Sequence, residues 1–450
     1  MATKRPQAVR HWPTPALLAA LLVSLLSAPR PVTAKYGQFA PPDAYENGSS
    51  LAYYGSENPW NRRMFDQRSA DRFTKRQGQR QLLAILEGQP EQAVAWCRQR
   101  LDKNRADGEA LFTLTIAYCQ MGQPQQARTT MQKALATGLP LARYLAGPRE
   151  LLRPLTESDA FQRYLADHPV DLLHGPMLGN VTDRSAQFWV RTREAASVTI
   201  RVHKPGQEKV TASGTCQTSP LSDYTGIVAV EGLEPRAGYT YDVLIANRPA
   251  AAATPHTFRT YPPNGQPGDF RIAFGGGAGF TPRHESIWDR IASFRPDALL
   301  LLGDNVYIDL PEAPGPFHRY TYYRRQSRPE FRRLVDRTSV YAIWDDHDAG
   351  IDDIWMGPYL DRPAWKRPQW DLFRQNWVNP AYGDPKQLGC WFHFSIADVD
   401  FFLLDCRFYR TNPFGDHPSM LGPVQKAWLF DQLNRSQATF KVIVSSVPWA

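Results

Sequence analysis

The stretch ALLLLGDNVY, residues 298–307, is the most informative segment of the chain. Five apolar residues follow one another without alternation, and Gly303 and Asp304 come directly after them. A continuous apolar run that ends in small and acidic residues is typical of a strand buried on both faces of an α/β sheet. The glycine permits a sharp backbone turn that leaves the Asp304 carboxylate facing outward. The stretch therefore predicts a central strand with a functional acid at its carboxyl end.

Four further apolar runs end in a similar way. They are 270–274 before GGG (275–277), 340–344 before DDHD (345–348), 399–404 before Asp405, and 440–444 before Ser445 and Ser446. Because ligands gather at the carboxyl ends of strands in an α/β sheet, we expect all five runs to deliver residues to one edge of one sheet. The apolar character of the last run places it inside that sheet.

The residue types at these strand ends suit metal chemistry. Hard cations prefer oxygen ligands, which carboxylates supply. One carboxylate can bridge two metal ions, so Asp304 is a candidate for that role and Asp346 is a second ligand candidate. Tyr307 could add a phenolate ligand to a ferric ion, and His347 could protonate or stabilise a leaving oxygen. The competing interpretation of residues 345–348 is a solvated acidic turn, but a turn does not call for a histidine between aspartates.

An internal repeat occupies residues 78–168. The hexapeptide GQPEQA (88–93) recurs as GQPQQA (122–127), 34 residues later. This period, with a Gly-x-Pro turn between helical stretches, is the signature of tetratricopeptide-like (TPR-like) repeats. We expect stacked helical hairpins that fold separately from the rest, capped by one helix over 151–165. Such repeats could bind a peptide or serve only as a spacer.

Residues 171–262 alternate between apolar and polar side chains, as half-buried strands do, and predict a small β-sandwich of fibronectin-like size. The polar residues 35–77 predict a linker. Residues 1–34 combine positive charges, a short apolar run and the small-residue ending VTA, which predicts a secretory signal peptide; an uncleaved anchor is the alternative. The sequence thus predicts an exported multidomain protein, periplasmic or extracellular.

Composition excludes several other classes. The net charge is +8, yet there is no basic stripe, so we expect an anionic substrate rather than a nucleic-acid partner. No stretch after residue 34 reaches the ~18 apolar residues of a membrane helix. The five cysteines are odd in number and lack a C-x-x-C pair, which argues against a zinc knuckle or a disulfide scaffold. Most of them should be buried free thiols.

Five segments, in the same order, resemble those of a known family. They are GDNVY (303–307), WDDHD (344–348), LDCRFYR (404–410), LGPVQKAWL (421–429) and SSVPW (445–449). The first resembles the G-D-x-x-Y signature of calcineurin-like metallophosphoesterases. The other four resemble motifs of their alkaline phosphatase D, or PhoD-like, branch. GPMLG (175–179) and FWVR (188–191) are similar to that family's N-terminal domain, so the resemblance covers about 171–450.

The resemblance implies a phosphoesterase that hydrolyses phosphate mono- or diesters with metal-activated water. Two or more divalent or trivalent metals are implied, such as iron with calcium. The implied metal ligands are Asp304, Tyr307 and Asp346, and the implied catalytic residues are His347, Arg407 and Arg410. The two arginines would hold phosphate oxygens, for which a guanidinium is well shaped; ordinary ion pairs are the alternative.

The chain departs from the family pattern at two places. The family's opening strand ends in G-S-C, whose cysteine is a metal ligand, whereas Gly277 has no side chain. His284 or Glu285 could compensate, although ordinary helix roles are expected for both, and the glycines could instead offer backbone N–H groups to a phosphate. The family's later histidine ligands have no counterpart before Ala450. We therefore expect a metallophosphoesterase domain over 270–450 that is incomplete at its C-terminus and a poor catalyst.

Two rival hypotheses remain from the sequence. One is a truncated, non-catalytic interaction module that uses the TPR-like and β-sandwich segments; the missing histidines favour it, and the intact acid and histidine set opposes it. The other is a peptide-binding scaffold led by the helical repeats.

Overall fold

The computed structural model describes residues 78–250, 254–280, 282–351, 353–385, 387–413 and 415–448. The predicted signal peptide and linker lie outside these residues. Within the described ranges, no helix combines the length and the apolar character needed to cross a membrane. All five cysteines are free thiols, and four of them are buried, as predicted for most of them.

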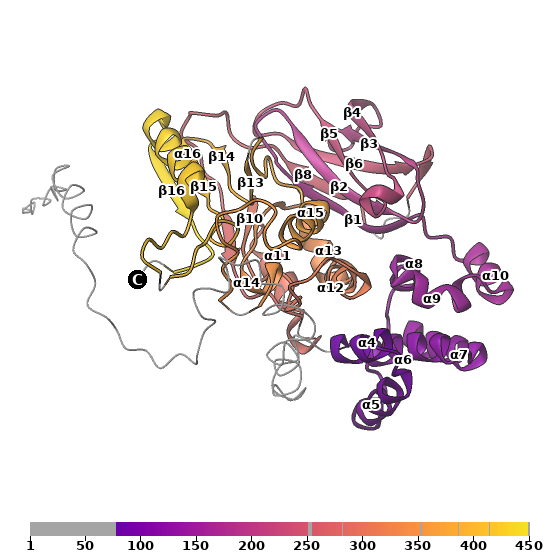
Figure 1. The fold of residues 1–450 in the computed structure, drawn as a ribbon. Helices are drawn as coiled ribbons and strands as arrows, with labels where there is room; N and C mark the ends of the chain where they lie inside the picture. The colour runs from indigo at the N-terminus through magenta and orange to yellow at the C-terminus, as the bar shows by residue number, and fades with distance from the viewer. Residues whose placement is uncertain are drawn as a thin grey trace, which may run out of the picture. The chain divides into compact units, whose positions relative to one another are not determined.

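Every described element between residues 79 and 167 is a helix (Figure 1). These helices are α4 (Gln79–Leu86), α5 (Pro90–Lys103), α6 (Gly108–Gln120), α7 (Pro124–Ala136), α8 (Ala142–Ala146), α9 (Arg149–Thr156) and α10 (Asp159–Asp167). The two Gly-x-Pro turns behave alike. Gly88 and Gly122 adopt positive φ after α4 and α6, and a proline then opens α5 and α7. Proline suits a first helical position because its missing N–H would have no intrahelical partner there.

The single capping helix predicted over 151–165 is instead two helices. The break falls at Ser158, whose Oγ accepts a hydrogen bond from the backbone N–H of Phe161 at 3.3 Å and so caps α10. A serine side chain competes for backbone donors, which favours a helix start over a helix interior.

The helical segment, which is predicted to fold separately, packs against the region that follows it. Glu109 on α6 accepts hydrogen bonds from Arg143 on α8 (3.0 Å) and from the Tyr320 hydroxyl (2.9 Å) on α12 (Pro316–Gln326). The Gln79 side-chain amide donates to the backbone carbonyl of Tyr307. Buried apolar residues of both regions belong to one continuous core. A buried carboxylate with two donors from different segments fixes how those segments pack.

The largest sheet joins two regions that the sequence analysis treated as different domains. Its strand order is β5-β2-β1-β11-β10-β9. These strands are β5 (Thr225–Val230), β2 (Ala186–Thr192), β1 (Leu172–Gly179), β11 (Ser339–Ile343), β10 (Ala298–Leu302) and β9 (Ile272–Gly275). β10 is parallel to both neighbours, and β1 meets β11 in parallel at Gly179 and Val340. The sheet therefore continues across the predicted domain boundary, because β1 pairs with β11, some 160 residues later in the chain. Local sequence patterns do not predict such a pairing.

The remaining strands of the predicted sandwich form a second sheet. It is ordered β4-β3-β6-β7, and β8 also pairs with β6. These strands are β3 (Ser197–His203), β4 (Val210–Gln217), β6 (Gly238–Ile245), β7 (Arg248–Pro249) and β8 (His256–Arg259), and the short 3₁₀ helix η5 (Pro220–Ser222) follows β4. Phe188 of β2 packs against Tyr241 of β6, with ring centroids 4.6 Å apart.

The five predicted strands divide between two sheets, which corrects the expectation of one. The last two belong to a three-stranded sheet, β14 (Phe392–Ile396), β15 (Val399–Leu403) and β16 (Phe440–Val444). The predicted interior strand β16 lies at its edge: among the described strands it pairs only with β15, and Phe440 is 63% exposed. The stacked rings of Tyr341 and Phe394, with centroids 3.7 Å apart, join this sheet to the large one. Pairing order depends on contacts between distant residues, so apolar runs alone do not specify it.

Helices and short elements complete the molecule. They are η6 (Pro282–His284), α11 (Ile287–Ser293), α13 (Pro329–Val335), α14 (Asp346–Ala349), α15 (Lys366–Asn376), β12 (Gly383–Asp384), β13 (Gln387–Leu388) and α16 (Gly422–Arg435). Trp288 of α11 packs edge-on against Phe331 of α13. Leu429 of α16 covers the buried Phe402 and Leu404 next to β15.

Candidate metal centre

The turn after β10 brings two strand ends together. Gly303 has φ +99°, and a Cβ at this position would lie 2.5 Å from the Cβ of Asp345. Only glycine therefore allows the end of β10 to approach the end of β11 so closely. Asp304 follows with φ +53°, a left-handed conformation that aspartate tolerates better than most residues. The result is that Asp304 stands beside the acidic turn after β11.

Asp348 ties the two turns to each other. Its buried carboxylate accepts hydrogen bonds from the backbone N–H groups of Asn305 (3.2 Å), Val306 (3.0 Å) and Asp345 (3.0 Å). Burial raises the pKa of Asp348 well above its usual range. These bonds run from one turn to the other, so Asp348 holds the frame of the site. The alternative of a solvated acidic turn does not fit, because Asp346, His347 and Asp348 are all buried.

Four residues predicted from the sequence gather at this frame. Ligand atoms of Asp304, Asp346 and His347 all lie within 4.8 Å of one another. The Tyr307 hydroxyl donates to Asp304 Oδ2 at 3.0 Å, and its ring centroid lies 4.4 Å from that of His347. The structure therefore brings Asp304, Tyr307, Asp346 and His347 into one cluster.

Burial and crowding of charge perturb the acids of this cluster. Burial, reinforced by the charge of Asp346, raises the pKa of Asp304 to about 6. Burial acts in the same sense on Asp346, but the Arg407 guanidinium and His347 bring the pKa of Asp346 below its usual value. Such opposed shifts in one buried cluster are typical of functional sites.

Asp309 is a site residue that sequence reasoning missed. Its fully buried carboxylate binds Nδ1 of His347. Burial alone would lower the pKa of His347, but Asp309, helped by Asp346 and Asp304, raises it to about 9. The backbone N–H of Ile308 also donates to the His347 carbonyl at 2.9 Å. An aspartate five residues after Asp304 in an irregular loop carries no periodic signal, so only the GDNVYID context could have suggested it.

The two predicted arginines differ in their surroundings. Arg407 is 4% exposed and donates through Nε to Asp345 at 2.5 Å, and its Nη2 lies 3.5 Å from Asp346. Arg407 thus neutralises the acidic turn. This agrees with the alternative named above, an ordinary ion pair, rather than with a contact to phosphate. Arg410 is more exposed, and its Nη1 lies 3.9 Å from Asp353. Arg410 is therefore the better placed of the two to meet an incoming anion.

Residues of the other motif segments (404–410, 421–429 and 445–449) hold the acidic turn and Arg407 in place. Asp405 accepts hydrogen bonds from the indole of Trp344 (2.8 Å) and from the backbone N–H of Arg407 (2.9 Å). Gln425 of α16 both donates to and accepts from the backbone of Asp405. Ser446 donates to Asp345 at 2.9 Å. These contacts explain why acid, arginine, glutamine and serine stand at those positions of the chain.

Gly277 lies beside the cluster, but its backbone is already engaged. Its N–H donates to the carbonyl of Gly303 at 3.1 Å, so it is not offered to a phosphate as suggested from the sequence. A Cβ at this position would meet only Tyr307, whose hydroxyl would be 3.7 Å away. Glu285 does not replace the missing ligand, because it is buried against Arg325 at 2.5 Å and Trp288 at 3.0 Å. His284 is exposed.

One carboxylate oxygen of the cluster bears on whether a metal ion fits there. Oδ1 of Asp304 is buried and receives no hydrogen bond from any residue that the structure describes. A buried carboxylate oxygen without a donor calls for a cation. The two carboxylates offer oxygen ligands of the kind that zinc and calcium accept, and the Tyr307 phenol offers a further oxygen. The residues present therefore fit a metal ion, with Asp304 at the centre.

Two regions of the chain match models of known protein families. Residues 272–450 match the family model of PhoD-like phosphatases, and residues 169–263 match that of a domain of unknown function (DUF7800). No curated protein matches the chain significantly.

Among solved structures, one described as the structure of PhoD is 18% identical, with a TM-score of 0.51, over 59% of this chain and 60% of that one. The chain thus spans less than two thirds of that structure's length. A purple acid phosphatase, PPD1, from yellow lupin (Lupinus luteus) seeds is 11% identical, with a TM-score of 0.44, over 61% of this chain and 51% of that one. The first of these shows a shared fold, and the family model of PhoD-like phosphatases matches less than half of the chain, residues 272–450.

Proposed function

We propose that this protein is a metal-dependent phosphoesterase that hydrolyses phosphate mono- or diesters. The single observation that carries the proposal is the buried cluster of Asp304, Asp346 and His347, in which one carboxylate oxygen has no donor among the described residues. The PhoD-like phosphatase match over the same residues supports it. Metal ions bound there would lower the pKa of a water molecule and neutralise phosphate oxygens.

The protein's own residues would divide the work. Asp304 and Asp346 would supply negative charge to hold the cations, and Tyr307 would orient Asp304 through the 3.0 Å hydrogen bond. The Asp309 contact at Nδ1 of His347 fixes the imidazole ring and raises its basicity. Proton transfer to a leaving oxygen then falls to Nε2 of the same ring.

Arg410 is the candidate for orienting the substrate. Its side chain is 15% exposed, whereas that of Arg407 is 4% exposed and lies between Asp345 and Asp346. Among the described residues, Arg410 forms an ion pair with one carboxylate, that of Asp353 at 3.9 Å, so its guanidinium retains donors for a phosphate oxygen. We assign Arg407 the different task of balancing the negative charge of Asp345 and Asp346.

Two further roles extend the proposal. A leader over residues 1–34 would deliver the enzyme outside the cytoplasm, where phosphate esters of the envelope or medium are available. The helical segment over 78–168 would hold the site, through Gln79 and Tyr307, and could additionally receive a peptide.

The test is metal content together with hydrolysis. The purified chain is dialysed against a chelator, reloaded separately with iron, calcium and zinc, and assayed with p-nitrophenyl phosphate and bis-p-nitrophenyl phosphate. We expect stoichiometric binding of at least one metal and chelator-sensitive hydrolysis of one or both substrates. A folded chain that binds no metal and hydrolyses neither ester would overturn the proposal and favour an interaction module.

A further inference from the structure

A cavity of about 430 Å³ lies away from the metal centre, where the helical segment meets the phosphatase domain. Its walls come from α5, α6 and α8 on one side, and from α12, α13 and the loop after β9 on the other. Arg143, Arg328, Glu330 and Phe280 are among the lining residues. None of them has a part in the phosphoesterase chemistry proposed above, so the cavity requires its own explanation.

Arg143 on α8 is fully buried, and it is only partly satisfied. Its Nη2 donates to Glu109 at 3.0 Å, and the guanidinium stacks on the Phe112 ring, 4.2 Å from the centroid. Nε and Nη1 have no hydrogen-bond partner among the residues that the structure describes. Leaving buried charged donors unpaired is strongly unfavourable, so two such donors on a cavity wall indicate a bound group.

Arg328, at the junction of α12 and α13, repeats the same arrangement. Its Nη2 donates to Glu330 at 3.1 Å, and its guanidinium lies 5.8 Å from the centroid of the Phe280 ring. The buried Nε again lacks a partner within the described part of the chain. Each arginine therefore donates to one carboxylate and has at least one further N–H donor without a partner among the described residues. The planar fork of a guanidinium matches phosphate oxygens.

The same cavity also contains an acceptor that lacks a donor. Glu330 uses Oε1 for Arg328, whereas its buried Oε2 receives no hydrogen bond from the described residues. The other lining acids are already paired, Asp107 with Arg100 at 2.9 Å and Glu109 with Arg143. A ligand that satisfies all three groups must carry an anion for the arginines and a donor for Glu330. The volume is in the range of small-molecule sites.

We propose that this cavity binds a small organic phosphate that carries an amino or hydroxyl group. The phosphate oxygens contact Arg143 and Arg328, and the amino or hydroxyl group donates to Glu330. The site is independent of the metal centre and does not rest on the phosphoesterase activity.

Calorimetric titration of the full chain tests this with two probes whose C–P bonds a phosphoesterase cannot hydrolyse. 3-Aminopropylphosphonate presents both groups, and propylphosphonate presents only the anion. At constant ionic strength, we expect the amino compound to bind about tenfold more tightly, the scale of one charge-assisted hydrogen bond. Arg328→Gln should weaken both probes, and Glu330→Gln should remove the difference between them.

The controls separate this cavity from other sites. Arg328 is 25% exposed, so its variant is expected to fold even if replacement of the buried Arg143 is not tolerated. Arg295→Gln, in the arginine-lined groove near the start of β10, should leave both affinities unchanged. Absence of binding, equal weakening by Arg295→Gln, or loss of binding in Asp304→Asn would each refute the proposal.

Discussion

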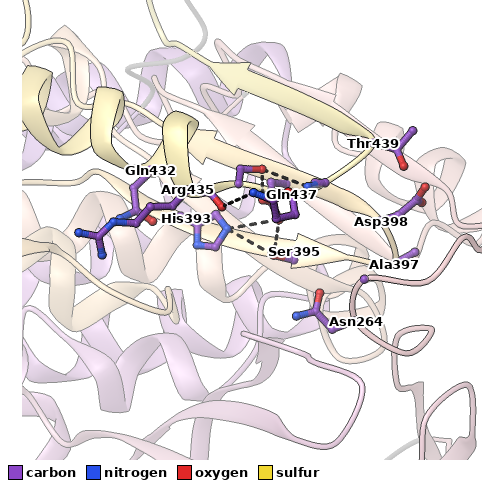
Figure 2. A pocket seen from close by; sticks show the side chains of 13 residues that line it. Asn264, His393, Ser395, Ala397, Asp398, Gln432, Arg435, Gln437 and Thr439 are labelled. Carbon is purple, nitrogen blue, oxygen red and sulfur yellow. Dashed lines mark hydrogen bonds and ion pairs between the residues drawn. The ribbon is translucent and has the colours of Figure 1, made fainter.

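Two histidine–aspartate pairs lie in different parts of the molecule, and their surroundings differ. His347 and Asp309 belong to the metal centre, with side chains that are 10% and 0% exposed. His393 and Asp400 lie on β14 and β15, with a His393 side chain that is 34% exposed; Figure 2 shows the His393 ring directed toward Ser395. Each ring also lies against an aromatic neighbour: the His347 ring is tilted by 30° to that of Tyr307, and the His393 ring stacks on that of Phe402. Residue type and pairing are thus the same at both places.

The carboxylates distinguish the two clusters. Burial tends to raise the pKa of Asp400, but hydrogen bonds from Ser395 at 2.6 Å and Ser436 at 2.5 Å bring it below its usual value. Both oxygens of Asp400 therefore have donors, whereas Oδ1 of Asp304 has none among the described residues. The Ser395 hydroxyl donates its hydrogen bond to Asp400 rather than to His393, so this cluster is not arranged as a nucleophilic triad. An incompletely satisfied acid cluster indicates function, and a satisfied one indicates structure.

The largest expected effect separates the clusters by activity. Asp304→Asn removes the negative charge of this side chain and one of its two possible ligand oxygens, so we expect turnover to fall about a thousandfold and metal content to drop. Asp400→Asn, the matched change in the other cluster, should alter turnover less than about twofold. The measurements are the metal content and the rate of ester hydrolysis of both variants. Comparable losses in the two would mean that the clusters do not differ in function.

Arginines next to the two clusters should differ in their contribution to stability. Arg407→Met leaves the buried Asp345 and Asp346 without their cation, and breaking a buried pair in this way lowers the free energy of unfolding by about 3–5 kcal/mol. Arg435 lines the pocket in Figure 2, is 76% exposed and pairs with Asp431 at 2.8 Å. Arg435→Met should change stability by less than about 1 kcal/mol. Urea unfolding of the metal-free proteins measures both, and equal losses would contradict the contrast.

The pair at His347 should also show in the pH dependence of stability. The folded-state pKa of about 9 exceeds the ordinary value of 6.5, so the stabilisation is complete below pH 6.5 and is lost as pH rises through 9. Its full size is about 3 kcal/mol. Asp309→Asn should flatten this slope in the metal-free protein and reduce turnover of the loaded enzyme about 10–100-fold. The slope should persist in Asp400→Asn; a slope unchanged by Asp309→Asn would show that another group titrates.

The sequence was sufficient to predict the cluster, because each of its members lies within five residues of a buried strand. Asp304, Tyr307, Asp346 and His347 follow apolar runs, and parallel strands bring their carboxyl ends together. Asp309 escaped prediction because its loop has no periodicity. The identity of the carboxylate that pairs with Arg407 also escaped prediction, since a contact between residues 345 and 407 is set by tertiary packing.

Domain organisation was harder to predict for the same physical reason. The helices over 79–167 follow from local turns such as Gly88 and Pro90, but their attachment depends on Glu109 meeting Tyr320, 211 residues later. The division of strands between two sheets likewise depends on pairing, and β16 pairs only with β15. Local patterns therefore predicted elements, and the long-range pairing of those elements had to be observed.

The smallest expected effect concerns the satisfied cluster itself. Asp400 on β15 accepts from Ser395 on β14 and from Ser436 in the loop between α16 and β16, so its carboxylate links the two strands to that loop. Asp400→Asn exchanges one acceptor oxygen for a donor and leaves at least one hydroxyl without its partner. Because the side chain is 15% exposed, water replaces part of the loss, and we expect a decrease of about 1 kcal/mol in the free energy of unfolding. His393→Gln should cost less still, since His393 lies 3.3 Å from Ser395 and 3.5 Å from Asp400 at the more exposed side. Denaturant unfolding at pH 7 measures both changes. A loss of metal or of turnover in either variant would show that this cluster communicates with the metal centre, and the distinction between satisfied and unsatisfied acids would then not separate structure from function in this protein.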